Sequence, residues 1–138
     1  MPDNQKKTSK QLTLAIHSTD NSYCFGSREN NNNQSDTFLI RNFEKDLCNN
    51  LVTDFQKFIS NENLNRINKI SVSIGPANFN ASRLIVVLAR TISLQINCPL
   101  AGFSSFELMA KRIALNNKIY KKSQSFWIYK ELKRRGFI

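Results

Sequence analysis

The sequence is short of histidine, of paired cysteines and of acidic charge, and each shortage argues against a class of protein. His17 is the one histidine among 138 residues, so any nucleophile with an imidazole base would have to use it. Its place beside turn-forming residues predicts instead a turn histidine at a strand end. Cys24, Cys48 and Cys98 are odd in number and widely spaced. This pattern argues against a disulfide framework or a zinc site and predicts buried, reduced thiols.

Long apolar runs and phosphate-binding loops are missing as well. No window approaches the roughly 20 consecutive apolar residues of a membrane span, and the N-terminal MPDNQKKTSK has no apolar targeting segment. We therefore expect a cytoplasmic protein that contacts no membrane. Neither GxxxxGK[ST] nor GxGxxG occurs, and the ten carboxylates are scattered along the chain. Nothing in these patterns supplies the active site of an enzyme, and we expect the protein to hold neither a metal nor a cofactor.

Positive charge is abundant but unevenly distributed. The net charge of +10 is typical of a nucleic-acid-binding protein. Residues 1–10 contribute +2, residues 117–138 contribute +6, and the 106 residues between them only +2. We expect a flexible basic leader over 1–10, one α/β domain over 11–116, and a basic, aromatic tail over 117–138.

The spacing of apolar residues predicts the elements of that domain. Short apolar runs between turn formers predict strands at 12–16, 23–27, 37–41, 69–74 and 99–103, the first two forming a hairpin. Apolar residues at every third or fourth position predict helices at 44–60, 81–96 and 104–113. Asn78 or Asn80 is the expected N-cap of the second helix, and Ser104 with Glu107 forms a capping box at the third. The order β-β-β-α-β-α-β-α predicts a single domain with a mixed five-stranded sheet.

The tail admits two interpretations. Its aromatic residues, including Phe126, Trp127 and Tyr129, favour a short C-terminal helix that docks on open sheet surface. Basic residues between aromatics are also typical of RNA contact, because cations neutralise phosphates and rings stack on unpaired bases. The candidate RNA contacts are Lys121, Lys122, Lys130, Lys133, Arg134 and Arg135.

Three motifs occur in order in the central part of the chain. They read Ala15-Ile16-His17-Ser18-Thr19, then Gly75-Pro76-Ala77-Asn78-Phe79-Asn80-Ala81-Ser82-Arg83, then Pro99-Leu100-Ala101-Gly102-Phe103-Ser104-Ser105-Phe106-Glu107. Together they resemble the TsaB (YeaZ) family, the dimerisation subunit of the machinery that makes threonylcarbamoyladenosine in tRNA. The resemblance implies the N-terminal domain of that family, with a ribonuclease-H-like (actin-like ATPase) fold. It also implies a non-catalytic subunit, although the family carries a glycoprotease-like label.

Departures from the family pattern bear on nucleotide binding. The family-motif loop comprises His17, Ser18, Thr19, Gly75, Pro76, Asn78, Phe79 and Asn80. His17 stands where nucleotide-using relatives have a carboxylate, and imidazole does not replace a carboxylate as a ligand for a hard cation. Ala77 and Ala81 replace two glycines, which hinders close approach of a phosphate to the backbone. We therefore expect no ATP and no magnesium to bind.

The resemblance assigns association to two helices. It implies that helices 44–60 and 81–96 bind a TsaD-like catalytic subunit or a second copy of the chain, with a TsaE-like ATPase as a further candidate partner and tRNA contacted indirectly. The expected interface residues are Leu47, Leu51, Phe55, Arg83, Val86, Val87, Arg90 and Leu94. Apolar residues framed by arginine suit an interface, although Val86, Val87 and Leu94 could instead pack within one chain.

These observations lead to a functional hypothesis with two alternatives. The hypothesis is a scaffold subunit that supports threonylcarbamoyladenosine modification of tRNA by binding a TsaD-like subunit. The first alternative is a small basic RNA-binding module, motivated by the tail. The second is a homodimeric paralogue that has lost the modification role.

Overall fold

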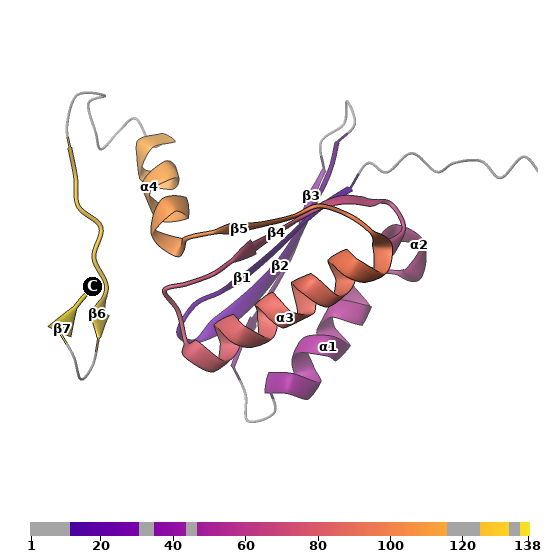
Figure 1. Cartoon of the computed structure of the whole chain (residues 1–138), viewed down its shortest axis with the longest axis horizontal. Helices are drawn as coiled ribbons and strands as arrows, with labels where there is room; N and C mark the ends of the chain where they lie inside the picture. The colour runs from indigo at the N-terminus through magenta and orange to yellow at the C-terminus, as the bar shows by residue number, and fades with distance from the viewer. Residues whose placement is uncertain (1–11, 31–34, 44–46, 116–124, 133–135) are drawn as a thin grey trace, which may run out of the picture.

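A five-stranded sheet forms the centre of the protein (Figure 1). The computed structural model describes residues 12–30, 35–43, 47–115, 125–132 and 136–138, so the predicted leader lies outside the described residues. The strands of the sheet are β1 (Leu12–Ser18), β2 (Ser22–Glu29), β3 (Asp36–Asn42), β4 (Ile67–Ser73) and β5 (Leu100–Phe103). The spatial order is β3-β2-β1-β4-β5. Strands β1, β2 and β3 pair antiparallel, whereas β1, β4 and β5 pair parallel, which confirms the predicted mixed sheet.

The helices follow the predicted order, with one addition. They are α1 (Leu47–Phe58), α2 (Asn61–Leu64), α3 (Phe79–Ile96) and α4 (Ser105–Leu115). The single turn of α2 was not predicted; its N-cap is Ser60, whose hydroxyl accepts a hydrogen bond from the Asn63 N–H. The N-cap of α3 is Asn78 rather than Asn80. None of the described helices is long and apolar enough to cross a membrane.

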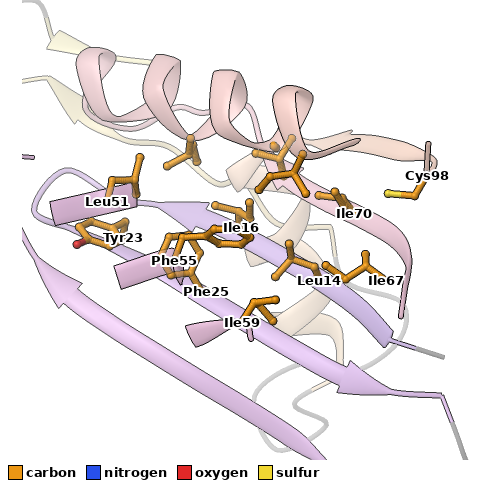
Figure 2. Packing of buried hydrophobic residues seen from close by; sticks show 14 of the residues in the cluster. Leu14, Ile16, Tyr23, Phe25, Leu51, Phe55, Ile59, Ile67, Ile70 and Cys98 are labelled. Atoms are coloured by element: carbon orange, nitrogen blue, oxygen red, sulfur yellow. The ribbon is translucent and has the colours of Figure 1, made fainter. Parts of the chain in front are cut away.

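The hydrophobic core lies between one face of the sheet and the helices α1 and α3 (Figures 1 and 2). Helix α3 buries residues at intervals of three or four, which turns one stripe toward β1 and β4. Helix α1 contributes Leu51, Phe55 and Ile59. The ring of Phe25 on β2 lies edge-on to that of Phe55, with centroids 5.6 Å apart. The buried positions of β1, β2 and β4 that complete this core are Leu12, Leu14, Ile16, Tyr23, Phe25, Ile67, Ile70 and Val72.

The structure corrects the prediction that all three cysteines are buried and the prediction that His17 lies in a turn. Cys98 is buried and Cys24 half-buried, but Cys48 is exposed, because it lies on the outward side of α1. His17 lies at the end of a strand, as predicted, but within β1 and not in the turn: β1 continues through Ser18, and His17 pairs with Cys24 of β2.

The described part of the tail is extended and not the predicted helix. It forms the two short strands β6 (Glu131–Leu132) and β7 (Gly136–Phe137). The prediction fails for a physical reason: the side chain of Trp127 is 93% exposed and that of Tyr129 is 70% exposed, so neither ring supplies the apolar burial that would stabilise a docked helix. The RNA-contact candidates Lys121, Lys122, Arg134 and Arg135, together with Lys133, lie outside the described residues.

Candidate functional site

The three sequence motifs meet at one end of the sheet. Strands β1 and β4 are parallel, so the loops that follow them lie at the same edge. The Asn78 N–H donates to the Thr19 carbonyl at 3.4 Å, and the Ser105 N–H donates to the Gly75 carbonyl at 2.7 Å. Each of the three motifs is therefore hydrogen-bonded to a neighbouring one.

The loop between β4 and α3 depends on its glycine. Gly75 has a φ of +101°, a conformation that side chains with a Cβ rarely adopt. At the end of this loop the Asn78 side chain accepts a hydrogen bond from the Ala81 N–H at 3.2 Å. The amide thereby satisfies one of the free donors at the start of α3.

A cavity of about 370 Å³ opens beside these loops, and it is lined by residues of β1, the β1–β2 turn, α4 and the tail. Ser18 and Ser105 are 1% and 2% exposed, and their hydroxyl oxygens have no hydrogen-bond partner within the described residues. Two residues that line the cavity, Lys130 of the tail and Asp20 of the β1–β2 turn, form an ion pair at 2.6 Å. The tail therefore contacts the β1–β2 turn, although 110 residues separate the two groups.

The ionisable groups that line this cavity include His17, Asp20 and Lys130. Burial lowers the pKa of His17 from its ordinary value of 6.5, which favours the neutral imidazole at physiological pH. The Asp20 carboxylate is engaged by Lys130. Within the described ranges no three His, Cys, Asp or Glu side chains are grouped so that they could hold a metal ion.

The outward surface of α3 carries an apolar stripe. Phe79, Val87 and Leu94 are 71%, 62% and 74% exposed, and Arg83 and Arg90 are exposed between them. We call Phe79, Arg83, Val87, Arg90 and Leu94 the α3 stripe. At 100° per residue these five positions fall on the side of the helix opposite the buried residues of α3. The Arg83 guanidinium lies 5.2 Å from the Phe79 ring centroid, a cation–π contact that holds both side chains on the surface.

Six of the eight predicted interface residues fall into two groups. Arg83, Val87, Arg90 and Leu94 are on the surface, where an interface would need them. Leu51 and Phe55 are 3% and 7% exposed; they face the sheet, because α1 turns its apolar stripe inward, and their assignment to an interface is wrong.

Two of the predicted interface residues stand apart from that division. Val86 is half-buried and packs against the core. The side chain of Leu47 lies outside the described residues.

Sequence reasoning missed two features. One is the Asp20–Lys130 ion pair, for which no local pattern gives a signal. The other is the exposure of two apolar side chains on the predicted strand β3, where Phe38 and Ile40 are 68% and 65% exposed.

Comparisons with known proteins agree with this geometry. The tRNA threonylcarbamoyladenosine biosynthesis protein TsaB of Buchnera aphidicola is 35% identical over 74 residues, covering 47% of this chain and 34% of TsaB. Two solved Pseudomonas aeruginosa structures, YeaZ and a protein described as similar to peptidase YEAZ, each match with a TM-score of 0.64 and 12% identity, over 78% of this chain and 50% of theirs. No protein-family profile matches. The resemblance to the TsaB family and the α/β fold expected from it are confirmed, and the chain spans about a third of TsaB and half of each solved structure.

Proposed function

We propose that this chain, a relative of TsaB, is a non-catalytic partner subunit that binds a TsaD-like protein through the α3 stripe and so supports threonylcarbamoyladenosine modification of tRNA. The observation that carries the proposal is the exposure of Phe79, Val87 and Leu94 on one side of a helix. The name of the Buchnera relative supports the pathway.

The composition of the stripe suits a protein partner. Aromatic and aliphatic side chains form the buried centre of typical interfaces, and arginine is enriched there. In the α3 stripe, Arg83 and Arg90 alternate with the apolar residues. The helix itself is anchored by its opposite side, where Ala81, Ile85, Ala89 and Ile92 are buried. A partner would therefore meet a rigid, preformed surface, which lowers the entropic cost of binding.

A scaffolding role also agrees with the chemistry of the strand-end cavity. Nucleophilic catalysis needs a base within hydrogen-bond reach of the nucleophile. His17 Nδ1 is buried and has no hydrogen-bond partner among the described residues, so this nitrogen activates no nucleophile there. ATP and magnesium play no part in the proposed role.

Substitution of two apolar residues of the α3 stripe by glutamate tests the proposal. In the double variant Val87→Glu with Leu94→Glu, each charge would be desolvated in the complex, and we expect the dissociation constant for the TsaD protein of the same organism to rise at least about tenfold, equivalent to 1.4 kcal/mol. The measurement is calorimetric titration, accompanied by the threonylcarbamoyladenosine content of tRNA in cells that carry the variant.

A matched control uses the same helix. Gln95 is exposed and lies about 120° around α3 from the centre of the stripe, so Gln95→Glu should leave affinity unchanged. Equal affinity of the double variant and the native chain would show that the α3 stripe is not the binding surface.

A second function is favoured by a separate observation. Trp127 is 93% exposed and Tyr129 is 70% exposed, next to the basic residues of the tail. Exposed rings stack on unpaired bases, and each stacked base contributes about 1–3 kcal/mol. We therefore propose that the tail contacts single-stranded RNA segments.

Anisotropy of a labelled RNA stem-loop tests this contact. Trp127→Ala should weaken binding at least about fivefold, whereas Leu115→Ala, at a residue that is 82% exposed on α4, should have no effect. Binding should also weaken steeply with added salt. Unchanged affinity of Trp127→Ala would mean that the rings do not stack on RNA.

A further inference from the structure

Within the described part of the chain, the backbone groups on the outer edge of β3 have no hydrogen-bond partner. β3 pairs with β2 and is the last strand of the sheet on that side among the described residues. The Phe43 N–H donates to the Asn21 carbonyl, and the Glu29 N–H donates to the Ser35 carbonyl. Bonded pairs alternate along an antiparallel ladder, so the odd-numbered residues of β3 bond to β2. The N–H and C=O groups of Asp36, Phe38, Ile40 and Asn42 therefore point away from the sheet.

The same edge exposes apolar side chains. Phe38 and Ile40 are 68% and 65% exposed on the face of the sheet away from α1 and α3, since Leu39 between them packs against the core. The Phe38 ring covers Gly26 on the neighbouring strand and would lie 3.2 Å from a Cβ there. Proteins usually protect an edge strand with charge, proline or a bulge. The centre of β3 has none of these.

We propose that a second copy of this chain pairs with β3, antiparallel, about a two-fold axis through Leu39. In this register Phe38 lies opposite Ile40 of the second copy, and Ile40 lies opposite its Phe38. Asp36 lies opposite Asn42 at each end. Each of these even-numbered pairs exchanges two backbone hydrogen bonds, and the two sheets become one continuous sheet.

The sequence of β3 is the reason for choosing a second copy as the occupant. The strand reads Asp-Thr-Phe-Leu-Ile-Arg-Asn, and its apolar residues are symmetric about Leu39. A shift of two residues would place Asp36 opposite Ile40 or Phe38 opposite Asn42, which loses an apolar pair. A shift of one residue would turn side chains to the wrong face.

A groove beside the strand provides space for the partner. On the core side of β3, residues including Leu39, Arg41 and Phe58 line a groove of about 470 Å³ between the strand and α1. Leu39 of the second copy would lie on the two-fold axis, next to this groove. Cross-strand pairs of an aromatic with a β-branched residue, as Phe38 and Ile40 form, stabilise antiparallel sheets.

Sedimentation of the full chain tests the interface. We expect the native chain at tens of micromolar to sediment as a dimer, and Ile40→Lys to raise the dissociation constant at least tenfold, because it places two lysines at the centre of the paired edge. Leu94→Lys is the matched control, because Leu94 is 74% exposed on α3 and the variant also replaces an exposed aliphatic side chain by lysine. This variant should leave the dimer intact.

The outcomes separate the two surfaces. A native chain that stays monomeric at 100 micromolar, about the upper end of such an assay, would overturn the proposal. So would a dimer that Leu94→Lys dissociates and Ile40→Lys does not, since association would then use the α3 stripe. The first result leaves the proposed binding of a TsaD-like protein at the α3 stripe unaffected, whereas the second would make the dimer and that protein compete for one surface.

Disulfide formation tests the register. A non-bonded antiparallel pair has Cα atoms about 4.5 Å apart, which a disulfide can span. Leu39→Cys, in a Cys48→Ser background that removes the exposed thiol, should therefore cross-link two copies under mild oxidation. Thr37→Cys should not, because the two copies of residue 37 lie four residues apart along the axis of the strand, about 13 Å. Equal cross-linking of both variants, or of neither, would overturn the register.

Discussion

A substitution of Phe55 tests whether the apolar residues of α1 stabilise the core or bind a partner. Its side chain is 7% exposed and packs edge-on against Phe25 at 5.6 Å. Truncation by Phe55→Ala removes a buried ring and leaves a cavity beside Phe25, at a cost of about 3–5 kcal/mol in the free energy of unfolding. Domains of this size have about 5–15 kcal/mol of stability in total. We therefore expect the melting temperature to fall by roughly 10–20 °C.

Thermal and urea unfolding followed by far-ultraviolet circular dichroism measure this effect. Val52→Ala is the control, because Val52 is on the same helix but 47% exposed, and its truncation should change stability by no more than about 0.5 kcal/mol. Below its melting temperature, Phe55→Ala should bind a TsaD-like partner as the native chain does. The reasoning is refuted if Phe55→Ala unfolds at the native temperature but loses the partner.

Three further predictions concern single polar groups. Burial lowers the pKa of His17, so the unfolded chain takes up the proton more readily than the folded chain. Stability should therefore be constant above pH 6.5, the ordinary pKa of the imidazole, and fall as the pH drops toward the lowered folded-state pKa; urea titrations should show a flatter profile for His17→Gln. The Tyr23 hydroxyl donates to Asp54 at 2.7 Å, so Tyr23→Phe should lower the free energy of unfolding by about 1–2 kcal/mol in the same titrations. Asn78→Ala should cost about 1 kcal/mol and Asn80→Ala about 0.5 kcal/mol or less, because only Asn78 caps α3; equal costs would contradict that assignment.

Local patterns were sufficient for most of the fold. The alternation at β4 and the periodicity of α3 are imposed by burial on one side, and burial is what the spacing of Ile70, Val72, Ile85 and Ala89 reflects. The tail differs because its aromatic residues resemble those of a packed helix, although Trp127 is exposed. An aromatic side chain can be buried, but the sequence around it does not show whether the rest of the fold offers an apolar surface that would cover it.

The same distinction explains the mixed result at the predicted interface. The apolar positions of α1 and of the α3 stripe look alike in sequence. Leu51 and Phe55 are covered by the sheet, whereas Val87 and Leu94 lie on the outward side of a helix whose other side is already buried. Helix α3 has apolar residues nearly all round, more than one buried stripe requires. These additional apolar residues were the sequence signal for a second, outward-facing surface. The Asp20–Lys130 ion pair had no such signal, since charge alone does not specify a partner 110 residues away.

The two proposed surfaces have different consequences for assembly. The α3 stripe lies on the outward side of a helix that packs on β1 and β4, whereas β3 is the far edge of the sheet, separated from β1 by β2. Pairing through β3 about a two-fold axis therefore leaves the α3 stripe of each copy uncovered. A TsaD-like protein should then bind without dissociating the dimer, to form an assembly of two chains with two partners. Light scattering of the mixture measures this directly; a complex of one chain with one partner at concentrations where the chain alone is dimeric would show that the two surfaces compete.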